Sequence, residues 1–120
     1  MKYTLGNKDN NPFFNINIYY IMSYKLKGII PSTKEGKKLM AVFINKATNR
    51  QKTTHFGAKG MDDYTITKDK EQRERYRKRH QKDLKTNDPT RAGYLSYYIL
   101  WGDSTSIKKN ISSYKKRFNL

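Results

Sequence analysis

The sequence predicts an α+β fold, in which a small antiparallel sheet, made of a β-hairpin plus N-terminal strands, is followed by about three helices. Strand-like segments all lie before Gly57, whereas helical spacing and helix caps are found after Gly60. A length of 120 residues leaves room for one domain. We expect this single α+β domain over residues 23–120, preceded by an N-terminal arm, residues 1–22.

The predicted sheet of the domain is built from three segments. Residues 24–30 form a short strand. Residues 37–45 contain a run from Leu39 to Ile44 that is apolar on both faces, as expected of a central strand. A polar connection leads to residues 52–56, so the last two segments form a β-hairpin with a loop longer than the tightest types.

The arm contains a further strand-like segment, residues 13–22, in which apolar residues alternate with asparagines. Such a strand satisfies its backbone only by pairing with another strand. We therefore expect it to add to the sheet of a neighbouring protein during assembly. The residues on its apolar side are Phe14, Ile16, Ile18 and Tyr20.

Helix signals divide the rest of the chain into three segments. The first helix spans about residues 69–82 and begins with a capping box, in which Asp69 accepts from the backbone and Gln72 reaches back. The second spans residues 88–101, with Asp88 as its cap. Its rings sit at helical spacing, which favours a place in the core; they are Tyr94, Tyr97, Tyr98 and Trp101.

The third predicted helix begins at Ser104 and has the most regular apolar spacing in the chain. We expect its apolar face to pack against the hairpin, on Leu39, Ala41 and Phe43 or the residues that alternate with them. The residues of this face are Ile107, Ile111, Tyr114 and Phe118.

The sequence offers little for catalysis or for a membrane span. It has no cysteine, and its longest apolar run is far shorter than the roughly 20 residues of a membrane-spanning helix. Asp62, Asp63, Asp69, Glu71 and His80 could form a metal-dependent nuclease cluster, but acids at helix starts are ordinary caps and metal-ligand spacing is lacking. We expect no enzymatic activity, cofactor, catalytic residue or metal ligand, and interpret His80 as a half-buried ring.

The chain carries 26 Lys and Arg against 10 Asp and Glu, a net charge of +16. Much of the excess lies in residues 23–60, where Glu35 is the only acid. Such cations attract nucleic acid, an acidic protein surface or anionic lipid headgroups. The residues that we predict to bind this partner are Lys25, Lys27, Lys34, Lys37, Lys38, Lys46, Arg50 and Lys52.

The densest basic run, Arg73 to Arg79, favours a different interpretation. Acids are almost as frequent as bases in residues 61–88. Two acid–base pairs stand at i, i+4 with the acid first, which is the better orientation on a helix: Glu71 with Arg75 and Glu74 with Lys78. We therefore interpret this run as a solvated, salt-bridged helix face.

A set of spaced motifs runs from His55 to Phe118. It comprises His55-Phe56-Gly57-Ala58, Asp63-Tyr64-Thr65, Lys68-Asp69, Arg75-Tyr76, Arg79-His80, Asp88, Thr90, Ala92-Gly93, Leu100-Trp101 and Lys116-Arg117-Phe118. This set resembles a family of small basic proteins of large and giant double-stranded DNA viruses, which typically carry FGxxG, DYT, YxxRH and TAG-aromatic motifs and a helix ending in Leu-Trp. The resemblance covers about residues 37–118.

The resemblance implies a virion component without enzymatic activity. We expect a minor capsid protein of the cement or scaffold type, made in the host cytoplasm and located in the capsid. Its partners would be the major capsid protein and other minor capsid proteins, with nucleic acid or an inner-membrane lipid surface as further possibilities. The alternative is a basic protein that binds nucleic acid during genome packaging or compaction; basic-only stretches no longer than triplets favour the structural role.

Overall fold

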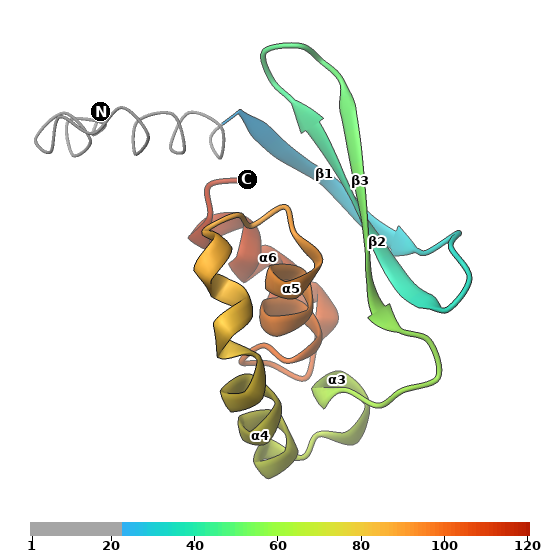
Figure 1. Ribbon diagram of the computed structural model, residues 1–120, viewed down its shortest axis with the longest axis vertical. Coiled ribbons are helices and arrows are strands. Elements are labelled where there is room, and N and C mark those ends of the chain that lie inside the picture. The colour runs from blue at the N-terminus through green and yellow to red at the C-terminus, as the bar shows by residue number, and fades with distance from the viewer. Residues whose placement is uncertain (1–22) are drawn as a thin grey trace, which may run out of the picture.

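The computed structural model describes residues 23–120. The predicted strand of residues 13–22 lies outside the described residues, and so do its predicted contact residues Phe14, Ile16, Ile18 and Tyr20. A three-stranded antiparallel sheet is followed by helices, which confirms the α+β class (Figure 1). The elements are β1 (Tyr24–Pro31), β2 (Lys37–Asn45), β3 (Gln51–Ala58), α3 (Tyr64–Thr67), α4 (Lys70–His80), the 3₁₀ helix η1 (Gln81–Thr86), α5 (Ala92–Leu95), the π-helix η2 (Ser96–Leu100) and α6 (Ile107–Arg117).

The strand order is β1-β2-β3, so β2 is the central strand, as predicted, and the other two are edges. Alternation along the strands turns Leu26, Ala41, Phe43 and Phe56 to one face, where each is at most 1% exposed. These side chains share one core cluster with residues of the helices. The helices therefore cover this face of the sheet (Figure 1).

β3 ends close to η2, and this approach depends on a glycine. Gly57 has a φ of +81°, and a Cβ atom there would lie 2.7 Å from the Leu100 side chain. Glycine alone meets both conditions without strain, because it has no Cβ and populates positive φ freely. The sheet and the helical layer can therefore come together tightly at this end.

The start of α4 is confirmed, and its capping box is formed only in part. The Asp69 carboxylate accepts hydrogen bonds from the backbone N–H groups of Glu71 and Gln72. The side chain of Gln72 does not reach back, because its oxygen accepts from the Thr67 hydroxyl at 2.8 Å. Thr67 belongs to α3, a single helical turn that was not predicted from the sequence. The helix ends at His80 and continues as η1.

The second predicted helix begins later than expected, at Ala92. The Asp88 carboxylate does not cap it, because it accepts from both the backbone N–H and the hydroxyl of Thr90. The Thr90 carbonyl in turn accepts from the Thr54 hydroxyl on β3. These hydrogen bonds hold the segment before α5 in a turn against the sheet, so the helix begins only at Ala92. From Ser96 onward the helix widens into η2.

The third predicted helix also begins later, at Ile107, with Ser106 in place of Ser104 as its cap. The Ser104 hydroxyl accepts from the Ser106 N–H instead. The predicted inner face is confirmed, with Tyr114 fully buried and its other three members packed against the core. α6 packs chiefly against η2 rather than on the hairpin, because η2 lies between the two.

The rings predicted for the core are there: Tyr94, Tyr97 and Trp101 are 6–8% exposed, and Tyr98 packs against the cluster. Tyr94, Tyr98 and Tyr114 contact Phe118 or one another at centroid distances of 4.8–6.1 Å. Buried aromatic area therefore compensates for the small number of aliphatic residues in the chain.

In the described part of the chain, no helix is long and apolar enough to cross a bilayer.

Candidate functional site

The structure distributes the eight predicted hairpin cations over several places. Lys34 lies in the turn between β1 and β2, whereas Lys46 and Arg50 lie in the loop between β2 and β3. Because β2 runs the length of the sheet between these two connections, they lie at opposite ends of it (Figure 1). Lys25 and Lys27 are exposed on β1, and Lys37 is half-buried at the start of β2.

The remaining two cations hold the sheet and the helical layer together. The Lys38 Nζ lies 2.6 Å from a carboxylate oxygen of Asp63, whose side chain is 3% exposed. The Lys52 Nζ donates to the Thr90 hydroxyl at 2.8 Å. Both lysines therefore have structural contacts inside the domain, in addition to any contact with a partner.

Several of the motif residues line one cavity of about 640 Å³, between the end of the sheet and the helices. The sequence spacing gave no sign of this convergence, since the residues come from β3, α3, α4 and η2. Charges of both signs line the cavity, so it presents no single electrostatic character. Lining residues from the motifs include Phe56, Gly57, Asp63, Tyr76, His80 and Trp101.

A stack of three rings forms one wall of this cavity. Tyr76 lies between His80 and Trp101, with centroid distances of 4.1 and 4.3 Å. Burial raises the pKa of the Tyr76 phenol. The His80 ring is half-buried, as predicted, and its Nδ1 lies 3.0 Å from a carboxylate oxygen of Asp83. Because its neighbours occupy both faces of Tyr76, these rings join α4 to η2.

Of the residues that could have formed a nuclease cluster, three have structural contacts instead: Asp63, Asp69 and His80. Asp63 caps α3 and pairs with Lys38, and Asp69 caps α4. His80 is paired with Asp83. Within residues 23–120, no three His, Asp or Glu side chains are close enough to hold a metal ion.

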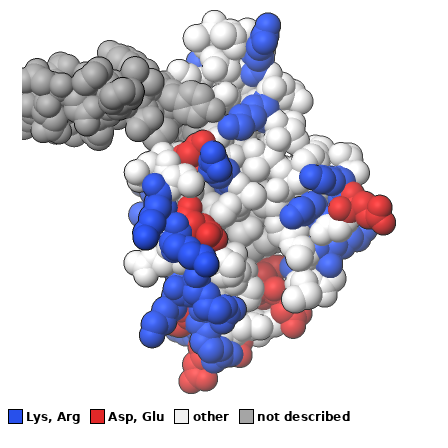
Figure 2. All heavy atoms as spheres, in the orientation of Figure 1, with Lys and Arg blue, Asp and Glu red and all other residues white. Residues whose placement is uncertain are grey.

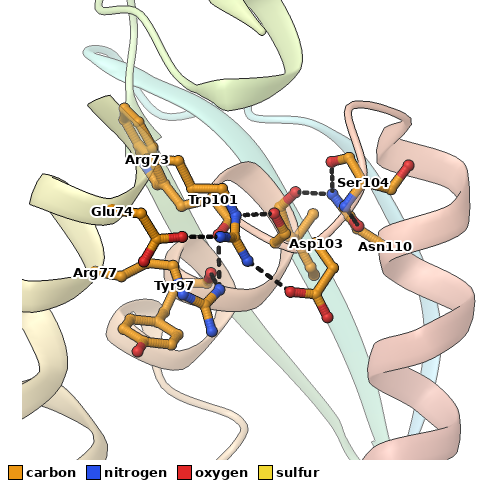
Figure 3. Close-up of polar contacts among 10 residues, drawn as sticks. Arg73, Glu74, Arg77, Tyr97, Trp101, Asp103, Ser104 and Asn110 are labelled. Carbon is orange, nitrogen blue, oxygen red and sulfur yellow. Dashed lines mark hydrogen bonds and ion pairs between the residues drawn. The ribbon is translucent and has the colours of Figure 1, made fainter. Parts of the chain in front are cut away.

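The end of η2 is held by two arginines of α4 (Figure 3). Arg73 Nε donates to the Gly102 carbonyl at 2.6 Å, and its guanidinium pairs with Asp103. Arg77 donates to the Trp101 carbonyl at 2.8 Å and lies over the ring of Tyr97. The last carbonyls of a helix have no partner within it and carry negative partial charge, so guanidinium donors suit them well.

These contacts correct the interpretation of Arg73 to Arg79 as a solvated face for Arg73 and Arg77 alone. The other basic residues of the run are exposed, as predicted: Arg75, Lys78 and Arg79. Arg73 is only 13% exposed, and the carboxylate that it meets on α4 is that of Glu74. Neither predicted pair, Glu71 with Arg75 or Glu74 with Lys78, is among the ion pairs of the described chain. Glu74 turns to Arg73 because the end of η2 and Asp103 already hold that guanidinium in place.

Asn110 adds to the polar contacts at the end of η2, and its role was not predicted from the sequence. Its side-chain amide donates to the carbonyls of Ile99 and Ser104, and its oxygen accepts from the Ser104 N–H. The residue is 3% exposed. A signal was present, because position 110 lies on the apolar face of α6, three residues after Ile107 and four before Tyr114.

Residues 28–80 match the model of DUF5754, a family of unknown function. No curated protein and no solved structure matches the chain. The DUF5754 match extends from the middle of β1 to the end of α4. It therefore includes β2, β3 and the two arginines that hold η2.

The outward side of α4 and η1 carries exposed cations that meet no acid of the described chain. Figure 2 shows Lys and Arg side chains gathered along this side of the molecule. The first part of this surface lies within the DUF5754 match, and η1 lies beyond it. We call it the basic row; it consists of Arg75, Lys78, Arg79, Lys82 and Lys85.

The sheet face opposite the helices is partly apolar. Met40, Val42 and Ile44 alternate with the buried residues of β2 and are half-buried, and Ile30 beside Met40 is 46% exposed. Gly28 lies opposite Val42, and the space that a Cβ would occupy there is open to a distance of 4 Å. We call Ile30, Met40, Val42 and Ile44 the outer apolar row. It lies entirely within the DUF5754 match.

Proposed function

We propose that the protein is a structural virion component, a minor capsid protein of a large double-stranded DNA virus that binds neighbouring capsid proteins and is not an enzyme. Its motif set supports this role through the resemblance to small basic proteins of such viruses. The observation that carries the proposal is the outer apolar row, on a sheet face that the helices leave uncovered. Contiguous apolar surface of this kind marks a protein–protein contact.

The charges beside the row indicate what kind of surface fits it. Lys25 and Lys27 are exposed on β1, and Lys25 lies directly opposite Ile44 in the sheet register. A partner with an apolar centre and carboxylates at its rim would satisfy both the row and these lysines. Charge complementarity of this kind orients two proteins and excludes wrong partners. We therefore assign the face to a neighbouring shell protein, either the major capsid protein or another minor one.

The proposal is tested by a triple variant, Met40→Thr, Val42→Thr and Ile44→Thr, made in the full chain. Threonine favours strands, so the sheet should persist while the row loses its apolar surface. We expect a cooperatively melting protein that is depleted from purified particles, as measured by quantitative mass spectrometry. The matched control replaces Met61 and Ile66 with Thr; both are exposed apolar residues away from the sheet, and this variant should be incorporated normally.

Fractionation of wild-type particles separates this role from others. After nuclease treatment and removal of the genome, the protein should remain with the shell. Release together with the DNA, or extraction together with lipid by mild detergent, would contradict the proposal. Normal incorporation of the folded triple variant would contradict the assignment to the outer apolar row.

A further inference from the structure

We propose that the basic row on α4 and η1 binds the phosphodiester backbone of nucleic acid. This is a second contact, on a different element from the sheet face assigned to shell proteins. The two contacts together would let one small protein join the shell to the genome.

The positions of the cations fit a series of phosphates. Arg75, Lys78, Lys82 and Lys85 follow one another at intervals of three or four residues, which places them on one side of α4 and η1. With a rise of about 1.5–2 Å per residue, successive charges lie about 5–6 Å apart along the axis. A duplex carries a phosphate every ~3.4 Å of axis on each strand, so each cation can meet a phosphate of its own.

The row also borders a hollow. A depression of about 570 Å³ is lined by residues of the row together with Gln81 and Leu84. Its lining residues from the row are Lys78, Arg79, Lys82 and Lys85. A backbone lying in this depression would meet several lysine and arginine donors, which adds hydrogen bonds to the charge attraction.

Neighbouring acids do not neutralise the row. Three of the nearest carboxylates in sequence have other contacts: Glu74 meets Arg73, Asp83 meets His80, and Asp88 accepts from Thr90. A fourth, Glu71, is exposed on α4 and forms no ion pair with the row. The cations are therefore available to an anionic ligand. Releasing the counterions that a nucleic acid condenses then favours binding.

The row is held on a fixed element before any ligand arrives. α4 has no buried residue, so apolar packing alone would not fix its orientation. Arg73, Arg77 and the stacked Tyr76 attach it to the end of η2. Because the helix is already positioned, binding requires no ordering of the backbone, which lowers the entropic cost.

The residue types favour nucleic acid over an acidic protein. The centres of protein–protein interfaces are apolar and aromatic, and they are depleted of lysine. The basic row contains no aromatic residue, and Leu84 is the sole apolar side chain lining its hollow. Contacts made by lysine and arginine alone are typical of sequence-independent binding to phosphates.

A triple variant of the full chain tests the inference: Lys78→Gln, Lys82→Gln and Lys85→Gln. Its matched control removes the same charge from exposed positions of α6: Lys108→Gln, Lys109→Gln and Lys115→Gln. Fluorescence anisotropy with a labelled random-sequence duplex gives the dissociation constant over a series of salt concentrations. Circular dichroism checks that both variants are folded, and all six substituted lysines are exposed, so the core is untouched.

We expect wild type to bind with a dissociation constant of about 10⁻⁴–10⁻⁶ M at physiological salt. Loss of three phosphate contacts should reduce the slope of log K against log salt by about 2.7 in the row variant, and the control should keep the wild-type slope. Equal losses in both variants would show that only net charge matters and would overturn the inference. Competition by polyglutamate as strong as by unlabelled duplex would also overturn it, in favour of an acidic protein.

The outcome is independent of the shell contact. A row variant that fails to bind DNA but enters particles normally supports both assignments. Normal DNA binding by the row variant overturns this inference alone, because the outer apolar row is unchanged in that variant.

Discussion

At the scale of single residues, Tyr114 shows how the helical layer is held together. Its side chain is 1% exposed, and its hydroxyl donates to the Pro89 carbonyl, at the turn that precedes α5. Burial is the main cause that raises the pKa of this phenol far above 10.0. One hydroxyl thus connects α6 to the segment that Thr90 fixes to the sheet.

Tyr114→Phe should lower the free energy of unfolding by about 1–3 kcal/mol, because the buried Pro89 carbonyl loses its donor. The pH dependence should change as well. A phenol whose pKa is raised in the folded state contributes its stability below the unfolded pKa of about 10, and this contribution is lost as the pH rises above that value. The free energy of unfolding, measured with urea, should therefore fall steeply above about pH 10 in wild type and less steeply in the variant. Identical alkaline slopes would contradict this account.

At the scale of elements, α4 is unusual because polar groups attach it to the domain. Arg73 and Arg77 each meet a backbone carbonyl at the end of η2, and a π-helix of this kind is rare and often lies at functional sites. Arginine is well suited to these two positions, because its planar guanidinium group donates several hydrogen bonds in fixed directions, whereas the ammonium group of lysine does not. The orientation of the basic row therefore depends on two residues that are not part of it.

The double variant Arg73→Lys and Arg77→Lys should be less stable than wild type by roughly 1–3 kcal/mol, although its net charge is unchanged. Amide hydrogen exchange in α4 should become faster than in the sheet, because local opening of the helix costs less. The matched control, Arg75→Lys and Arg79→Lys, changes exposed arginines of the same helix and should leave both measurements nearly unaltered. Equal stability of the two variants would exclude a structural role for the inward pair.

At the scale of the whole molecule, the described domain has two different outer surfaces. The outer apolar row lies on the sheet, and the basic row lies on α4 and η1, on the far side of the core. The core itself is assembled from residues that begin at Tyr24. The described residues thus share one core, and we predict that residues 1–22 serve partner contacts and not this core.

Deletion of residues 1–22 should leave the midpoint of thermal unfolding nearly unchanged and should abolish incorporation into particles. Differential scanning calorimetry measures the first effect, and mass spectrometry of purified particles measures the second. Unfolding of the truncated chain would show that the arm belongs to the core.

Much of the fold was predictable because its signals act over a few residues. The apolar run of β2, the Asp69 cap and the ring spacing around Tyr97 each depend on near neighbours in the chain. The sheet, the start of α4 and the aromatic core could therefore be predicted. The late starts of α5 and α6 could not be predicted. Asp88 and Ser104 are good caps by type, but their oxygens accept from Thr90 and Ser106 instead.

Which partner each charged side chain contacts is set by the tertiary structure and could not be predicted from the sequence. Arg73 and Arg75 stand in the same basic run, yet one holds the end of η2 and the other faces solvent. Lys38 meets an acid 25 residues away, and Lys52 meets a threonine 38 residues away. Spacing along the chain predicts neighbours within a helix turn or a strand pair, whereas electrostatic contacts depend on distances in space that only tertiary packing sets.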